Sequence, residues 1–279
     1  MAAALAVATS SHATDAPPAD APQQVLVTAH EQPLEEKPYR DLLAAMSRFE
    51  RYRGEHPDAQ LRFRIYPRKD GVDITQLRAW IRDPEDASRV ELTVAADGGF
   101  TVPVLAAQRE HAAVVRTNMP EGTLAWTVEV KRSGDDGRHR RMGDLREACF
   151  LDVDFAHLAR VIKPPMIHAI DALSDNICLV HGVDWGFYAD KPVFSVHLDN
   201  GDRHVALLSD RLHTGHALPA FYPLVDWGYA LRDRLYSPPL NDASWPDDTT
   251  VSVIYADDPD DAIAAPAAAP LNTAESAKP

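Results

Sequence analysis

The chain has 279 residues, of which 45% are hydrophobic and 25% are charged. These values are typical of globular proteins, and the length allows one large domain or two of ordinary size. The 28 Lys and Arg residues against 42 Asp and Glu residues give a formal net charge of −14. This charge repels phosphate backbones and anionic lipid headgroups, so we expect no nucleic-acid partner. No stretch approaches the roughly 20 apolar residues that a membrane span needs, so we expect no membrane span.

The N-terminal residues have features of an export signal. Residues 2–8 are small and apolar, and Ser11-His12-Ala13 supplies small residues before a cleavage point near Thr14. We therefore interpret 1–13 as a remnant signal peptide and expect a periplasmic or secreted protein. The alternative is an Ala-rich disordered N-terminus, because no Lys or Arg precedes Lys37. Residues 14–36 are rich in Ala, Pro and acidic residues, which predicts a disordered leader.

The first predicted structural element is an amphipathic helix within 37–58. Its apolar residues recur at helical spacing, and Gly54 and Pro57 favour its end. These apolar residues are Leu42, Leu43, Met46 and Phe49.

Alternating apolar and polar residues follow, which is typical of strands with one solvated face. Leu61, Phe63 and Ile65 alternate with Arg62 and Arg64, and further short runs continue to Val130 with Gly-rich turns between them. This pattern predicts a small antiparallel β-sandwich over 59–133, immunoglobulin-like or transthyretin-like in architecture.

The remaining folded part is predicted to be a helical connector over 134–164 and a second small α+β module over 165–256. In that module two strand-like runs flank Asn200-Gly201, which favours a hairpin with a tight primed turn. Residues 257–279 begin with an acidic run and continue in Ala and Pro, which predicts a disordered tail. The expected fold class is mainly β with helices, that is, α+β.

A short basic run, Arg138-His139-Arg140-Arg141, directly follows the polar segment 133–137. Four residues are too few for a nucleic-acid tract, so we interpret the run as a solvated loop with basic flanks. An anion site is the alternative.

The two cysteines, Cys149 and Cys178, form an even pair in a chain with features of an exported protein. Such a pair favours a disulfide. Two buried thiols remain the alternative, because sequence alone does not show that the two Cα atoms come within reach.

The common enzyme motifs are absent from the sequence: it has no phosphate loop, no dinucleotide fingerprint, no Gly-x-Ser-x-Gly elbow and no His-Glu-x-x-His. His213 and His216 are three residues apart, a spacing that on a helix suits zinc, although Gly215 favours a loop. Surface or hydrogen-bonded histidines are the alternative interpretation, and no cofactor is expected. His181 and Asp184 complete the polar set that a hydrolase in the second module would use.

Aromatic residues are concentrated late in the chain, where 11 of the 21 lie between positions 181 and 255. Aromatic faces stack on sugar rings and anchor protein interfaces, but they also fill the core of a small domain that has few Leu and Ile residues. The candidates for a binding surface are Trp185, Tyr188, Tyr222, Trp227 and Trp245.

Several short motifs resemble exported proteobacterial proteins of unknown function. The resemblance covers about residues 60–150 and is carried by Leu61-Arg62-Phe63-Arg64, residues 96–103, Thr117-Asn118, Gly122, Trp126 and residues 141–146. It implies a β-sandwich with an appended module and no known activity, so it supplies no family catalytic residues to carry over.

Taken together, these features predict a binding or structural protein of the cell envelope, with a protein or an envelope glycan as partner. A hydrolase that uses His213, His216, His181 and Asp184 is the competing hypothesis.

Overall fold

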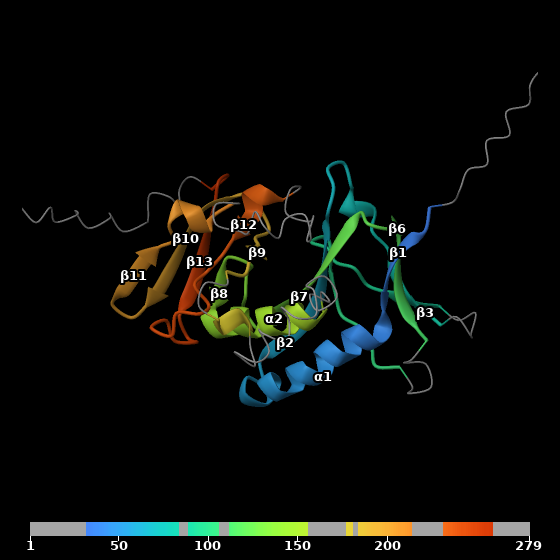
Figure 1. The fold of residues 1–279 in the computed structure, drawn as a ribbon, viewed down its shortest axis with the longest axis horizontal. Helices are drawn as coiled ribbons and strands as arrows, with labels where there is room; N and C mark the ends of the chain where they lie inside the picture. The colour runs from blue at the N-terminus through green and yellow to red at the C-terminus, as the bar shows by residue number, and fades with distance from the viewer. Residues whose placement is uncertain are drawn as a thin grey trace, which may run out of the picture. The chain divides into compact units, whose positions relative to one another are not determined.

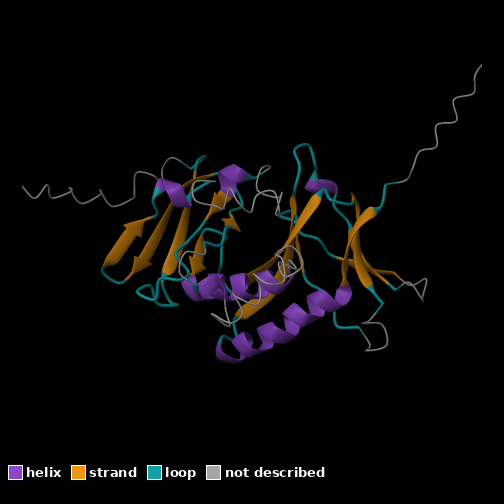
Figure 2. Ribbon diagram, in the orientation of Figure 1, coloured by secondary structure: helices purple, strands orange, loops and turns teal. Residues whose placement is uncertain are grey.

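The computed structural model describes residues 32–83, 89–105, 112–155, 177–180, 184–213 and 231–258, apart from the side chains of 153 and 154. These residues form a mainly β structure with two α-helices and several antiparallel sheets, which confirms the α+β class (Figures 1 and 2). The described residues from Pro33 onward belong to one compact unit.

Helix α1, Tyr39–Glu55, lies inside the segment 37–58 where a helix is predicted. Tyr39, Leu42, Ala45 and Phe49 are buried, so the apolar residues at helical spacing share the inward face. Pro38 precedes the helix in an extended conformation, with ψ 127°. The helix therefore begins directly after Pro38.

Strand β1, Leu34–Pro38, corrects the prediction that the disordered leader extends to residue 36. It pairs antiparallel with β6, Val114–Pro120. Glu35 accepts hydrogen bonds from the Gly122 amide at 2.6 Å and from the Trp126 indole at 3.3 Å. These partners lie more than 80 positions away, so local composition gives no indication of the strand.

Two sheets use the strands of the region 59–133. Strand β1 belongs to the sheet in the order β1-β6-β3-β4, with β3 at Ala79–Arg82 and β4 at Arg89–Leu92. The second sheet has the order β5-β2-β7. In it β2 is Ala59–Pro67, β5 is Gly99–Phe100 and β7 is Leu124–Arg132. A 3-10 helix, Ile74–Gln76, precedes β3 and is capped by Asp73.

Helix α2, Met142–Phe155, forms within the predicted connector and contacts both β7 and α1. Ala148, Leu151 and Phe155 of this helix join one hydrophobic cluster with buried side chains of α1 and of both sheets. Figure 1 shows both helices beside β2 and β7. One face of α2 is thereby fixed against the strand whose residues line the pocket described below.

A third sheet has the order β11-β10-β13-β8. Its strands are β8 at His139–Arg141, β10 at Val193–Asn200, β11 at Arg203–Ala206 and β13 at Thr250–Tyr255. The predicted hairpin is present, with Asn200 paired to Arg203 and Gly201 at φ +58° in the two-residue turn. This positive φ at the first turn position is typical of a primed turn.

Strand β8 changes the interpretation of the basic run 138–141. It pairs with β13, so a piece of the predicted connector belongs to the same sheet as the late strands. Arg140 points to the buried side and is 7% exposed, whereas His139 and Arg141 are exposed. The run is therefore a strand with one buried cation and not a solvated loop.

The disulfide between Cys149 and Cys178 is confirmed, with the two Cα atoms 6.2 Å apart. It joins α2 to the 3-10 helix Ile177–Leu179, and both cysteines belong to a second hydrophobic cluster. That cluster also takes buried residues from β10, β13 and the short strand β12, Leu235–Tyr236. Strand β12 pairs with β9, Phe187–Tyr188.

The last described residues correct the start of the predicted tail. Asp257 forms an ion pair with Lys191 at 2.9 Å, and Asp258 pairs with Arg138. Both cations also lie over the ring of Tyr255. The acidic run therefore begins as part of the folded structure. None of the helices in the described ranges has the length and apolar character needed to cross a bilayer.

Candidate functional site

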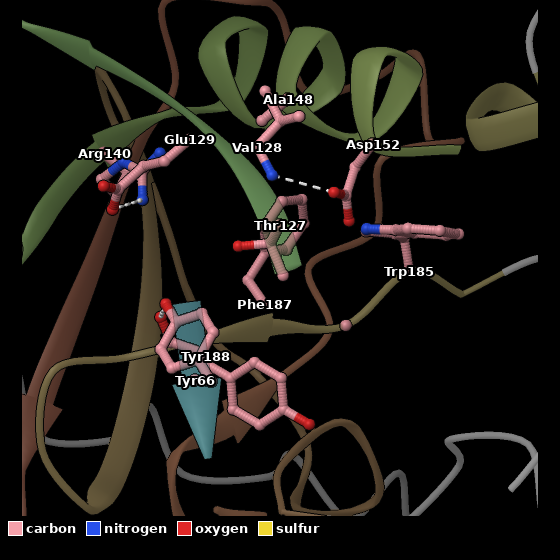
Figure 3. A pocket seen from close by; sticks show the side chains of 11 residues that line it. Tyr66, Thr127, Val128, Glu129, Arg140, Ala148, Asp152, Trp185, Phe187 and Tyr188 are labelled. Carbon is pink, nitrogen blue, oxygen red and sulfur yellow. Dashed lines mark hydrogen bonds and ion pairs between the residues drawn. The ribbon is translucent and has the colours of Figure 1, made fainter. Parts of the chain in front are cut away.

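A small pocket lies where β7, α2 and the segment around β9 meet (Figure 3). Strand β7 supplies Thr127, Val128 and Glu129 to its wall, and α2 supplies Ala148 and Asp152. The rest of the lining is Tyr66, Arg140, Trp185, Gly186, Phe187 and Tyr188. Carboxyl groups and aromatic rings therefore converge in one concave place, as they do in many ligand sites.

Asp152 is the most unusual group in this pocket, because it is a carboxyl group on the inward face of a helix. The residue is 4% exposed, and its Oδ1 accepts a hydrogen bond from the Val128 amide at 2.9 Å. Burial raises the pKa of Asp152 to about 7, although the Val128 amide and the charge of Lys37 act in the opposite direction. Asp152 therefore changes its protonation state near neutral pH.

Aromatic residues form the opposite side of the pocket. The rings of Tyr66 and Tyr188 lie 5.0 Å apart between centroids, and the Tyr66 hydroxyl donates to the Tyr188 carbonyl at 3.4 Å. Phe187 packs near Tyr236, with ring centroids 6.0 Å apart. Figure 3 shows the indole nitrogen of Trp185 pointing toward the carboxyl group of Asp152. Two of the predicted binding-surface residues, Trp185 and Tyr188, thus line the same pocket, but Tyr188 is buried in a small hydrophobic cluster with Tyr66 and Leu235.

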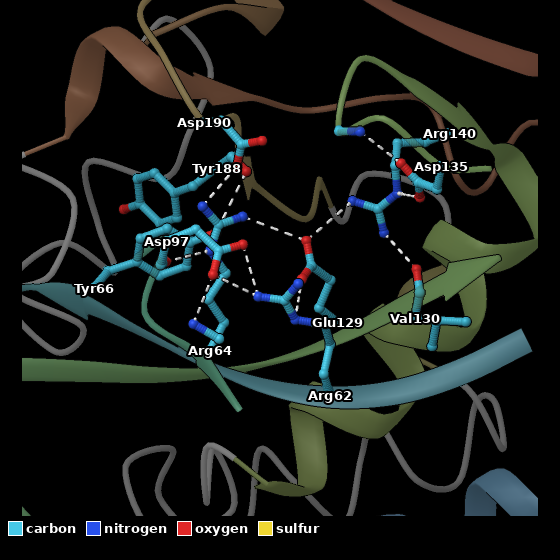
Figure 4. A network of polar contacts seen from close by, with 12 residues as sticks. Arg62, Arg64, Tyr66, Asp97, Glu129, Val130, Asp135, Arg140, Tyr188 and Asp190 are labelled. Carbon is cyan, nitrogen blue, oxygen red and sulfur yellow. Dashed lines mark hydrogen bonds and ion pairs between the residues drawn. The ribbon is translucent and has the colours of Figure 1, made fainter. Parts of the chain in front are cut away.

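Glu129 and Arg140 belong to a larger network of charges behind the pocket (Figure 4). Glu129 is 7% exposed and lies between three guanidinium groups. Its carboxylate oxygens lie 3.2 Å from Arg62 Nε, 3.3 Å from Arg64 Nη1 and 3.7 Å from Arg140 Nη1. Three guanidinium groups thus surround one carboxylate group in the interior of the protein.

The network continues on both sides of Glu129. Arg140 pairs with Asp135 at 3.1 Å and donates to the Val130 carbonyl at 2.8 Å. Arg64 pairs with Asp190 at 2.6 Å, which links β2 to the loop after β9. The pattern of alternating residues predicts Arg64 on a solvated face, but the residue is 4% exposed. Its charge is accommodated in the interior because carboxylates reach it from β7 and from the loop.

Two acidic residues at the ends of the network respond differently to it. Burial raises the pKa of Asp135, and the charge of Arg140 offsets only part of this effect. Burial also acts to raise the pKa of Asp97, but its two hydrogen bonds from Arg62 and one from the Gly99 amide hold that pKa below the usual value.

The predicted metal pair is only partly within the described residues. His213 is at φ +61°, and its Nε2 lies 2.8 Å from the Val193 carbonyl oxygen. His216 lies outside the described residues, so the pair stays a prediction. Among the residues that the structure does describe, no three His, Cys, Asp or Glu side chains are grouped as metal ligands.

The polar set proposed for a hydrolase is likewise divided. Asp184 pairs with Arg211 at 2.8 Å, whereas His213 contacts the Val193 carbonyl. His181 and His216 lie outside the described ranges. The two members that can be placed are therefore bonded to different partners.

Trp245 is predicted to lie on a binding surface, but the structure buries it. It is 3% exposed and belongs to the second hydrophobic cluster, with the guanidinium group of Arg203 3.6 Å from its ring centroid. A ring enclosed in this way is not available to a partner. Tyr222 and Trp227 lie outside the described residues. Phe194, which is 59% exposed on β10, is the large aromatic side chain that the described surface presents instead.

Asp152, Arg64 and Arg140 are site residues that the sequence interpretation missed. A signal for Asp152 exists, because it lies four residues after Ala148 and three before Phe155, on the apolar face of a predicted helix. An acidic residue at such a position points to a buried and perturbed carboxyl group. Arg64 and Arg140 have no comparable signal.

Comparison of the chain with protein-family models, with curated proteins and with solved structures found no match.

Proposed function

We propose that the chain is an exported binding protein of the cell envelope that recognises a glycan at the pocket around Asp152. The observation that carries this proposal is the position of a buried carboxyl group beside the indole of Trp185 in one pocket. Sugars present both apolar C–H faces and hydroxyl groups, and an aromatic ring beside a polar acceptor matches both. On this proposal the protein is periplasmic or secreted and acts by binding.

The charge of the chain argues against an anionic partner. A formal net charge of −14 opposes association with nucleic acids and with anionic surfaces. The disulfide supports export, because disulfides persist in oxidising compartments such as the periplasm. The small residues Ser11 and Ala13 add to this argument, since they suit cleavage of a signal peptide.

We also propose the finer architecture on which this function depends. The sheets β1-β6-β3-β4 and β5-β2-β7 form a small immunoglobulin-like or transthyretin-like sandwich, and the late strands form a second module. This arrangement is supported by the single hydrophobic cluster to which both early sheets contribute. In this arrangement the pocket lies at the junction of the two modules, which is a common location for ligand sites.

The test is co-sedimentation of the full chain with purified peptidoglycan sacculi. We expect the wild type to sediment with sacculi and Trp185→Ala to lose most of its binding, because this substitution removes the aromatic ring that lies beside Asp152 in the pocket. Phe194→Ala is the matched control, since it removes an exposed aromatic ring that does not line the pocket. Absence of wild-type binding, or loss of binding in Phe194→Ala alone, would overturn the proposal.

A hydrolase is the second candidate, and the raised pKa of Asp152 is the observation that favours it. A carboxyl group that holds its proton near neutral pH is suited to act as a general acid. The same sacculi distinguish the two candidates, because a hydrolase releases soluble fragments and a binding protein leaves the mass of the soluble fraction unchanged.

A further inference from the structure

Two polar groups of the Asp152 pocket face the same small space. Within the described part of the chain, the one hydrogen bond of the Asp152 carboxyl group is that from the Val128 amide to Oδ1. Over the same residues, the Trp185 indole N–H donates to no protein group. Figure 3 shows these two side chains pointing toward one another. The carboxyl group of Asp152, a residue that is 96% enclosed, and the indole N–H of Trp185 thus remain available to bind a guest, meaning a group of a ligand, between them.

The size of the space limits what this guest can be. The cavity has a volume of about 20 Å³, which is enough for one water molecule and too small for a sugar ring. A ligand can therefore insert only a small group, such as one hydroxyl, while the rest of it lies against the rim of the pocket.

The chemistry of the two groups limits the guest further. An indole N–H only donates, so the guest must accept a hydrogen bond from Trp185. The ionised carboxyl group of Asp152 only accepts, so the same guest must also donate one. A hydroxyl group does both. An ammonium group has no acceptor for the indole, and a carboxylate has no proton to donate and meets the negative charge of Asp152.

We propose that Asp152 and Trp185 form a subsite for a single hydroxyl group of a neutral saccharide. This inference depends on the glycan-binding function proposed above and names the class of ligand that the pocket selects. Trp185 then has two separable roles, because its ring contacts the sugar and its N–H binds the inserted hydroxyl.

Trp185→Phe separates these roles, since it retains an aromatic ring and removes the N–H donor. We expect Trp185→Phe to bind sacculi about tenfold more weakly than the wild type, the effect of losing one hydrogen bond to a buried partner. Trp185→Ala loses the ring as well and binds more weakly still. Phe194→Ala serves again as the control and keeps wild-type affinity, and a thermal unfolding curve for each variant verifies that it is folded.

A competition experiment on the wild type tests the same inference without any substitution. At pH 8, where Asp152 is largely ionised, free N-acetylglucosamine is expected to displace the protein from sacculi, whereas glucuronate at the same concentration is not. Equal binding by Trp185→Phe and the wild type would overturn the hydroxyl subsite while leaving glycan binding intact. Equal competition by the two sugars would overturn the selectivity for a neutral saccharide. If the wild type does not bind sacculi, the proposed function fails and the subsite fails with it.

Discussion

The guanidinium group of Arg64 lies 2.6 Å from the carboxylate of Asp190, which is 126 positions further along the chain. Arg64 comes from β2 of the early sheet, and Asp190 follows β9 beside the pocket. The same guanidinium group lies 3.3 Å from Glu129, a pocket residue. The buried side chain of Arg64 thus links β2 to the segment that carries Trp185.

Replacing this cation is expected to destabilise the protein strongly. Arg64→Ala removes the ion pairs of Arg64 with Glu129 and with Asp190. We expect this loss to lower the free energy of unfolding by about 3–5 kcal/mol. The control is Arg116→Ala, which removes a more exposed ion pair with Glu36 and costs about 0–1 kcal/mol. Urea denaturation of both variants gives the comparison. Similar losses in the two variants would contradict a structural role for the buried network.

The approach of Asp190 to Gly137 gives a second prediction. Gly137 has φ +80°, and a Cβ atom there would lie 2.4 Å from Asp190 Oδ2. Gly134 has φ +87° with nothing within 4 Å of its Cβ position, so it is a matched control for the backbone conformation. Alanine is strained at a positive φ, so we expect the free energy of unfolding to fall by about 1 kcal/mol in both variants for this reason alone. We expect Gly137→Ala to lose more stability than Gly134→Ala, because only the former displaces a carboxylate of the network. Equal melting temperatures would rule out this contact.

The disulfide is expected to contribute substantially to stability. The bridge between Cys149 and Cys178 spans 29 positions. On the chain-entropy model, closing such a loop contributes about 3–4 kcal/mol. We therefore expect Cys149→Ala/Cys178→Ala to unfold at a lower urea concentration than the oxidised wild type. Reduction of the wild type should lower its midpoint similarly and leave the double variant unchanged. A reductant effect of equal size on both proteins would indicate a cause other than the disulfide.

Elements set by local interactions were predictable from the sequence. The hairpin at Gly201 follows from a two-residue turn whose backbone suits glycine, and α1 follows from apolar residues at helical spacing. The disulfide followed from an even pair of cysteines in a chain with features of export. Strand β1 was missed, because its pairing with β6 bridges about 80 positions.

The site was less predictable, since it is made of long-range contacts. The concentration of aromatic residues pointed to Trp185 and Tyr188, but it did not separate them from Trp245, which is enclosed in the core. Arg64 follows the alternation of a solvated strand face and yet is buried, because the carboxylates that neutralise it come from distant segments. Burial of a charge by a distant partner leaves no periodic pattern in the sequence.

The buried carboxyl group of Asp152 predicts a specific dependence of stability on pH. Its pKa is about 7 in the folded protein and 3.8 in an exposed reference state, so the folded protein binds more protons between these values. The stabilisation is complete below pH 3.8 and is lost as the pH rises through 7, by about 1.4 kcal/mol for each pH unit between the two values. Asp152→Asn keeps an oxygen for the Val128 amide and removes the titration.

The expected result is a difference in the free energy of unfolding, Asp152→Asn minus wild type, that rises between pH 4 and pH 7 and is constant above pH 8. Glu147→Gln is the control, because burial also raises the pKa of Glu147 to about 7 but this residue is less enclosed and lies outside the pocket. Its smaller desolvation should give a smaller difference over the same range. Urea denaturation at closely spaced pH values measures both curves. A difference for Asp152→Asn that does not change with pH would mean that Asp152 titrates as an exposed carboxyl group, and the ionisation on which its role in the pocket depends would then be complete well below neutral pH.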